Sequence, residues 1–147
     1  MKIFIDGDGS PTKQEAIQIA KQYQLPVILV TSIDHYSTKP TAGHVETIYV
    51  DRGKDAADFK IISLISSGDI LITQDYGLAS LALTKAIVIH HLGMVYSKMN
   101  IDRLLQQRYE SQQLRKAKVR TKGPKPFTDE DRVHFKQVLE NIIQEQI

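Results

Sequence analysis

Five aspartates stand where they could hold a metal ion: Asp6, Asp8, Asp55, Asp58 and Asp75. Asp6 and Asp8 share a face in extended chain. Asp55 and Asp58 share a face where a helix has begun. Carboxylates brought together repel, and some of them take up protons unless a cation is present. Mg²⁺ or Mn²⁺ suits an all-oxygen site, lowers the pKa of a bound water and stabilises charge on a phosphoryl group, so the pattern predicts phosphoryl chemistry.

Alternating strands and helices must position these aspartates. Strands are predicted at residues 2–5, 26–31, 45–50, 69–73 and 85–89. Helices are predicted between them at residues 12–24, 56–65 and 77–83. Continuous apolar strands separated by helices indicate a parallel sheet covered on both faces. Because ligands of such sheets bind beyond the carboxyl ends of the strands, three strand ends bring the aspartates to one edge.

The end of the chain differs from this alternating part. Residues 99–114 predict a helix whose apolar side holds Ile101, Leu104, Leu105 and Tyr109. Residues 115–126 predict an irregular segment. Thr128 is expected to cap a last helix, with three acids in its first turn. The buried side of that helix is expected to hold Val133, Phe135, Val138, Leu139, Ile142 and Ile143.

Basic residues are concentrated in one segment. The chain carries 19 basic and 17 acidic residues, but residues 98–126 carry nine basic and two acidic ones. The basic residues of interest are Arg115, Lys116, Lys118, Arg120, Lys122 and Lys125. Such an arm would bind a polyanion such as RNA, although a solvated basic helix explains the charge equally well. Arg52 and Lys54 are further candidates for phosphate contact near the site.

Length and composition limit the classes of protein to consider. With 147 residues, 41% of them hydrophobic and 24% charged, the chain fits one globular domain. Its apolar segments are far shorter than a membrane span, and Asp6 comes too early for a secretory signal. The chain has no cysteine, which excludes disulfides and thiolate sites. We therefore expect a cytoplasmic protein without a membrane partner, and leave a homodimer open.

Four of the five aspartates also have a purely structural interpretation. Asp6 and Asp8 stand in a glycine-rich turn, while Asp55 and Asp75 each precede a predicted helix that they could cap. Ser10 is likewise available to cap the helix at residues 12–24. Taken together, the structural interpretations explain the pattern less well than a metal site does, because capping does not require acids at three strand ends.

Two other kinds of site were compared with the first motif. A calcium EF-hand loop fails, because Pro11 takes the position of the required glycine and Ile17 that of the bidentate glutamate. A strand followed by Asp-x-Asp-Gly also resembles the haloacid-dehalogenase-type phosphatases, in which Asp6 would be the nucleophile and Asp8 the acid/base. The acidic pair that those enzymes carry after a later strand is missing, so a phosphatase is the weaker alternative.

Two histidines follow the last predicted strand. His90 and His91 are adjacent, and adjacent side chains in an extended segment point in opposite directions. We therefore expect the two rings to lie apart, with at least one of them in a structural role.

Four motifs in order give the chain a family resemblance. They are Asp6-Gly7-Asp8-Gly9-Ser10-Pro11, Asp55-Ala56-Ala57-Asp58, residues 69–75 with Leu78-Ala79, and Gly123-Pro124-Lys125-Pro126-Phe127-Thr128. With these motifs the chain resembles the bacterial YaiI/YqxD family, which is grouped with the PIN-like nuclease superfamily. One departure is clear: the family's first motif usually reads Asp-Ala-Asp-Ala-Cys-Pro, whereas this chain has Gly7, Gly9 and Ser10.

The resemblance implies a fold and an arrangement of the site. It implies one PIN-like domain over residues 1–147, with an α/β core (1–97), a helix and basic segment (98–126) and a C-terminal helix (127–147). The fold would have three layers around a mostly parallel five-stranded sheet in the order 3-2-1-4-5. The metal would be bound by Asp6, Asp55 and Asp75. Asp8 and Asp58 would hold metal-bound water, and Ser10 or Thr73 would orient a carboxylate or a water.

The leading hypothesis is a PIN-like ribonuclease that uses Mg²⁺ or Mn²⁺ to hydrolyse RNA phosphodiesters. An RNA-binding module that keeps the fold without turnover is the alternative from another class. A small-molecule phosphatase remains the third.

Overall fold

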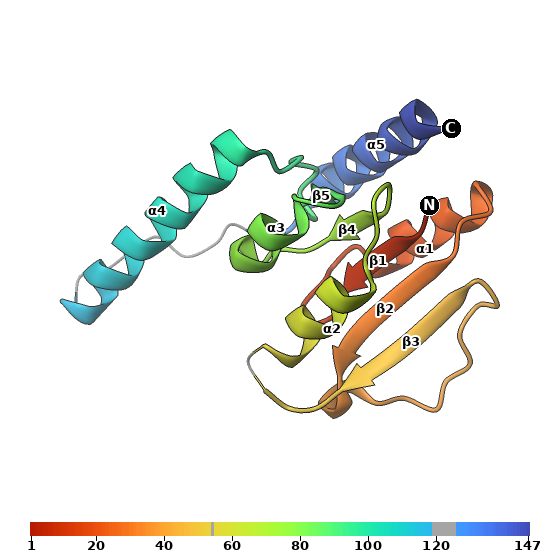
Figure 1. The fold of residues 1–147 in the computed structure, drawn as a ribbon, viewed down its shortest axis with the longest axis horizontal. Helices are drawn as coiled ribbons and strands as arrows, with labels where there is room; N and C mark the ends of the chain where they lie inside the picture. Colours follow the sequence, from red (N-terminus) through yellow and green to blue (C-terminus); the bar gives the residue numbers. More distant parts are fainter. Residues whose placement is uncertain (54, 119–125) are drawn as a thin grey trace.

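One parallel β-sheet forms the centre of the protein (Figure 1). In this computed structural model, which describes residues 1–53, 55–118 and 126–147, five strands lie in the order β3-β2-β1-β4-β5. They are β1 (Ile3–Asp6), β2 (Val27–Ser32), β3 (Val45–Val50), β4 (Ile70–Ile72) and β5 (Ile87–Ile89). Each neighbouring pair is parallel. The predicted α/β class, strand direction and strand order are therefore confirmed.

The central strand β1 is buried on both faces of the sheet. Side chains alternate across a strand, so Ile3 and Ile5 pack into one core while Phe4 packs into the other. All three are fully buried. A strand that is apolar at successive positions, as β1 is, suits only the interior of a sheet with both faces covered.

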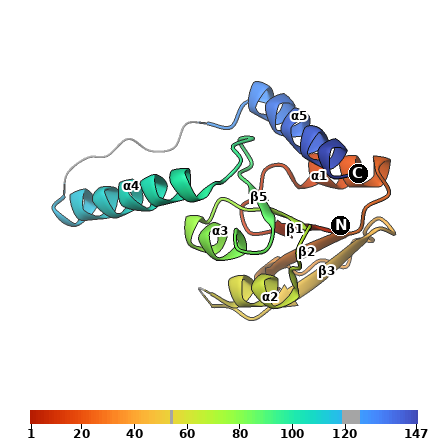
Figure 2. The same cartoon turned by 45° about the horizontal axis from the view of Figure 1, so that its top comes forward.

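Helices cover both faces and complete three layers (Figure 2). The helices are α1 (Lys13–Gln22), α2 (Ala56–Leu64), α3 (Tyr76–Ala82), α4 (Lys98–Lys116) and α5 (Asp129–Gln146). Side chains of α1 and α5 pack on the face that holds Ile3 and Ile5. Side chains of α2, α3 and the first half of α4 pack on the face that holds Phe4.

The start of α1 differs from the prediction. Ser10 was expected to cap this helix, but the cap position is Thr12, whose side chain makes no capping hydrogen bond. Residues 10 and 11 instead continue the loop after β1. The Ser10 hydroxyl oxygen is buried and has no hydrogen-bond partner among the described residues.

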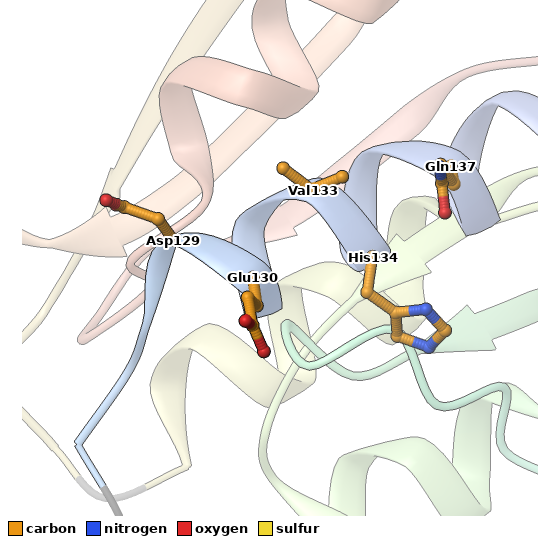
Figure 3. Close-up of a pocket in the computed structure, with 5 residues that line it drawn as sticks. All are labelled: Asp129, Glu130, Val133, His134 and Gln137. Atoms are coloured by element: carbon orange, nitrogen blue, oxygen red, sulfur yellow. The ribbon is translucent and has the colours of Figure 1, made fainter.

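The last helix is held by its cap and by one apolar face. The Thr128 hydroxyl accepts from the Asp131 N–H, and the Asp131 carboxylate accepts from the Thr128 N–H, as the predicted cap requires. Phe135 and Leu139 are fully buried against the sheet. Val133 was predicted to join them but is 55% exposed, beside Asp129 and Gln137 (Figure 3). Val133 lies two residues before Phe135, and successive residues are about 100° apart around a helix axis. The Val133 side chain therefore faces away from the sheet.

Helix α4 lies against the body of the protein at its start and projects away from it at its far end (Figures 1 and 2). Ile101 is buried and Leu104 and Leu105 are half-buried, as predicted. Tyr109 was predicted on the same apolar side but is 58% exposed, since the second half of the helix has left the core. Among the described residues, we found no helix with both the length and the apolar character that a membrane crossing needs.

We expect Phe135→Ala to lower the free energy of unfolding by about 3–5 kcal/mol, because it leaves a cavity between α5 and the sheet. Val133→Ala on the same helix is the matched control and should change it by about 0.5 kcal/mol or less. Urea unfolding followed by circular dichroism measures both. Equal effects of the two substitutions would contradict this packing of α5.

Candidate functional site

An acidic pocket of about 210 Å³ lies at the carboxyl edge of the sheet. Four of the five predicted aspartates line it, and they come from three segments that are distant in the sequence. The lining residues are Asp6, Asp8, Ser32, Val50, Asp51, Gly53, Ala57, Asp58, Gln74 and Asp75. The strand ends therefore do gather carboxylates around one space.

Asp6 is held in place by a threonine from the neighbouring strand end. It is the last residue of β1, and its Oδ2 atom accepts a hydrogen bond of 2.8 Å from the Thr73 hydroxyl. The same Thr73 oxygen accepts from the Asp75 N–H at 3.0 Å. Thr73 is itself buried. One hydroxyl thus orients the Asp6 carboxylate and joins it to the turn that carries Asp75.

Asp75 both caps a helix and lines the acidic pocket. Its Oδ1 atom accepts from the Leu78 N–H at 3.1 Å, which caps α3 as the structural interpretation expected. Its side chain also lines the acidic pocket. Capping and a place in the pocket are therefore compatible for this residue, because a carboxylate has a second oxygen.

Asp8 reaches the pocket through a turn that depends on Gly7. The Asp8 Oδ1 atom accepts from the Thr31 hydroxyl at 2.8 Å, and the His35 ring lies 3.5 Å from it. A Cβ atom at position 7 would lie only 2.9 Å from Leu29 Cδ1. The absence of a side chain at Gly7 therefore lets the chain pass close to β2 and bring Asp8 beside its end.

The segment after β3 contributes differently from the prediction. Asp58, in the first turn of α2, lines the pocket, whereas Asp55 is exposed and does not. The Asp55 side chain makes no capping hydrogen bond to α2 within the described part of the chain. Asp51, the first residue after β3, lines the pocket in its place. Asp51 also follows a predicted strand directly, so its position in the sequence was the signal that could have identified it.

The pocket disfavours negative charge on two of its carboxylates. Burial raises the pKa of Asp6 to about 6, against the lowering effect of the Thr73 hydrogen bond, and Asp75 and Asp8 raise it further. Burial also raises the pKa of Asp58 to about 6, with contributions from Asp75, Asp6 and Asp55. Ionising all these groups at neutral pH therefore costs free energy, which a bound cation would offset.

The donor set has the chemistry of a hard-cation site without its closed geometry. Within residues 1–53, 55–118 and 126–147, no group of three or more acidic or histidine side chains is placed to hold a metal ion. The carboxylates surround the pocket instead of meeting at one point. All of them are oxygen donors, which fit Mg²⁺ or Mn²⁺.

Those predicted phosphate-binding residues that the structure describes do not line this pocket. Arg52 forms an ion pair with Asp34, in the turn after β2, and both side chains are exposed. Ser10 is half-buried and lies outside the lining. Lys54, Arg120, Lys122 and Lys125 lie outside the described residues.

The described part of the basic arm lies at the far end of α4. Arg115 and Lys116 are in its last turn and Lys118 follows it, all three exposed. Figures 1 and 2 show this end projecting away from the sheet. These residues therefore form a surface separate from the acidic pocket.

The two histidines after β5 do not point apart as expected. The ring centroids of His90 and His91 lie only 4.1 Å from each other. Strand β5 ends at Ile89, and the chain then turns, with Gly93 at a positive φ of 91°. The alternation of an extended strand no longer applies beyond Ile89, so the prediction was wrong.

Comparison with known proteins agrees with the resemblance seen in the sequence. The model of the family described as "Uncharacterized BCR, YaiI/YqxD family" matches residues 4–145. The chain belongs to the YaiI/YqxD family. It is 59% identical over 144 residues to a UPF0178 protein of Enterococcus faecalis, covering 97% of each chain. It is 53% identical over 144 residues to one of Bacillus cereus, covering 97% of this chain and 99% of the relative. No solved structure matches the chain.

The departure from the family's usual first motif has a local structural correlate. Gly9 has a positive φ of 74°, which a residue with a side chain adopts at a cost. A Cβ atom there would also lie 3.1 Å from the Gln74 amide nitrogen. In this YaiI/YqxD protein, the loop conformation after β1 therefore favours the glycine that the chain carries.

We expect Thr73→Val to raise the pKa of Asp6 above its value of about 6. The hydrogen bond from the Thr73 hydroxyl stabilises the ionised carboxylate of Asp6, and the substitution removes it. A carboxyl titration of the metal-free protein by NMR measures this pKa. Thr84→Val, which removes an exposed hydroxyl bonded to the Leu81 carbonyl, is the control and should leave it unchanged. A lower pKa of Asp6 in the Thr73 variant would contradict the assigned hydrogen bond.

We expect the stability of the metal-free protein to fall as the pH rises from about 4 to about 6. The folded-state pKa of Asp58 is raised from 3.8 to about 6, so the folded protein binds this proton more tightly than the unfolded chain. The stability that this proton provides is present below pH 3.8 and is lost as the pH rises through the raised pKa. Asp58→Asn should make the dependence less steep, and Asp6, whose pKa is also raised to about 6, should keep the remainder.

Urea unfolding at a series of pH values gives this dependence. Asp102→Asn, on the exposed side of α4, serves as the control and should keep the wild-type slope. If the stability of the Asp58→Asn protein changed with pH as steeply as that of the wild type, Asp58 would not be a source of the pH dependence.

Proposed function

We propose that this protein is a PIN-like phosphodiesterase that hydrolyses RNA with the help of Mg²⁺ or Mn²⁺. The observation that carries the proposal is the acidic pocket, where Asp6, Asp8, Asp58 and Asp75 from three separate segments line one space. The strand order β3-β2-β1-β4-β5 also agrees with the one implied by the resemblance to PIN-like nucleases.

The residues of the acidic pocket would have different roles, according to their positions. Asp6, Asp58 and Asp75 would hold the cation, and Thr73 keeps the Asp6 carboxylate oriented. When bound, the cation offsets charge on the phosphate oxygens and makes a water more acidic. Asp8, whose carboxylate accepts a hydrogen bond from the Thr31 hydroxyl, would accept a hydrogen bond from that water.

Basic residues support a nucleic-acid substrate. Arg115, Lys116 and Lys118 form an exposed cationic end on α4, and such groups bind the phosphate backbone without reading its sequence.

A second candidate is an RNA-binding protein without catalytic turnover. It is favoured by the finding that no three metal-binding side chains in the described residues come together closely enough to hold a metal. This candidate predicts RNA binding that weakens with salt and persists without metal. Reversing the charge of Arg115, Lys116 and Lys118 together would abolish that binding, while Asp75→Asn would leave it intact.

Cleavage of labelled single-stranded RNA in Mn²⁺ tests the proposal. We expect Asp6→Asn to slow cleavage by roughly a hundredfold or more, and chelation of the metal to abolish it. Asp102→Asn, an exposed aspartate far along the sequence from the pocket, is the matched control and should cleave at the wild-type rate. Equal cleavage by wild type and Asp6→Asn would exclude catalysis at the acidic pocket.

A further inference from the structure

A second pocket, of about 470 Å³, adjoins the acidic one. Gln74 lines both, so the two spaces meet at the turn after β4. The second pocket has the size of small-molecule sites, which are roughly 300–1,000 Å³. Besides Gln74, its lining residues include Tyr76, His90, His91, Phe127 and Asp131. We call this the aromatic pocket.

The aromatic wall comes from two distant segments whose side chains contact each other. The rings of His91 and Phe127 meet edge to face, with centroids 5.6 Å apart. The Arg132 guanidinium carbon lies 4.9 Å from the centre of the Phe127 ring. Arg132 is in turn bound to the Glu15 carboxylate at 2.9 Å and to the Pro11 carbonyl at 2.8 Å. These contacts link the Phe127 ring to His91 after β5 and, through Arg132, to α1 and the loop after β1.

The histidines add polar edges without adding positive charge. Burial lowers the pKa of His90 to about 4 and also lowers the pKa of His91. The His90 Nδ1 atom accepts from the Leu92 N–H at 3.1 Å, so the neutral ring carries its proton on Nε2 and can donate there. Asp131 lines the same space and disfavours an anion. The pocket therefore suits a flat, uncharged ring with hydrogen-bonding edges.

We infer that the aromatic pocket holds the nucleobase of a nucleotide whose phosphate reaches the acidic pocket. This inference rests on the proposed function and names the part of the substrate that lies beside the scissile phosphate. Nucleobases stack on aromatic side chains whatever their sequence. The shared Gln74 places base and phosphate in adjoining spaces, and its amide can both donate and accept at a base edge.

Titration of the full chain with adenosine monophosphate or ribose phosphate, followed by NMR in Mg²⁺, tests the inference. The two probes share a sugar and a phosphate and differ in the base. We expect the nucleotide to shift the ring signals of His90 and His91 and to bind at least about fivefold more tightly than ribose phosphate. Equal affinities for the two probes would overturn the inference.

Variants of Phe127 test whether the aromatic pocket causes the difference in affinity between the two probes. Phe127→Ala should weaken nucleotide binding roughly 5- to 150-fold and leave the affinity for ribose phosphate unchanged. Phe127→Leu keeps apolar volume and should show the same direction if the alanine variant does not fold. Phe59→Ala, whose ring is 74% exposed on α2, is the control with wild-type binding. Wild-type nucleotide affinity in a folded Phe127→Leu protein would overturn the inference.

Binding and cleavage separate this inference from the proposed function. The titration requires no turnover, so base-dependent binding by a protein that does not cleave RNA overturns the proposed catalysis and supports the pocket. Asp6-dependent cleavage that is equally fast beside a normal and an abasic nucleotide overturns the aromatic pocket alone.

Discussion

The arrangement of the molecule depends on a buried strand that ends in a carboxylate. Strand β1 is covered on both faces, and its last residue, Asp6, carries a charge into a partly buried position where its pKa is raised to about 6. The hydroxyl of Thr73, from the end of β4, offsets part of that cost. The pairing of β1 with β4 in the sheet is what brings this hydroxyl within reach, so the packing of the core and the chemistry of the edge are coupled.

The two pockets follow from the same edge of the sheet. The acidic pocket gathers carboxylates from the ends of β1, β3 and β4, and the aromatic pocket lies on its β5 side. Helix α5 contributes through the residues at its start: Arg132 holds Phe127 in place and also bonds to the loop after β1. The C-terminal helix therefore stabilises the sheet with its apolar face and shapes the aromatic pocket with its first turn.

Much of the fold was predictable because local patterns and sheet geometry agree. Apolar strands, helical spacing and the Thr128 cap each gave an element that the structure contains. Three of the failures share a cause: Val133, Tyr109 and the paired histidines were placed by extending a local periodicity beyond the point where the chain still follows the core. Periodicity describes a single element and does not say how much of it another element covers.

The sequence by itself determined that acids follow three strands of a parallel sheet, because residue types and their spacing set the strands and the edge where they end. Only the tertiary structure decided which acids share the pocket, with Asp51 inside it and Asp55 outside. It alone also revealed the aromatic pocket, since His91 and Phe127 meet only when α5 packs on the sheet. The physical reason is that contacts between distant segments depend on loop paths and packing, which are set by all neighbours together and are not encoded in any one segment.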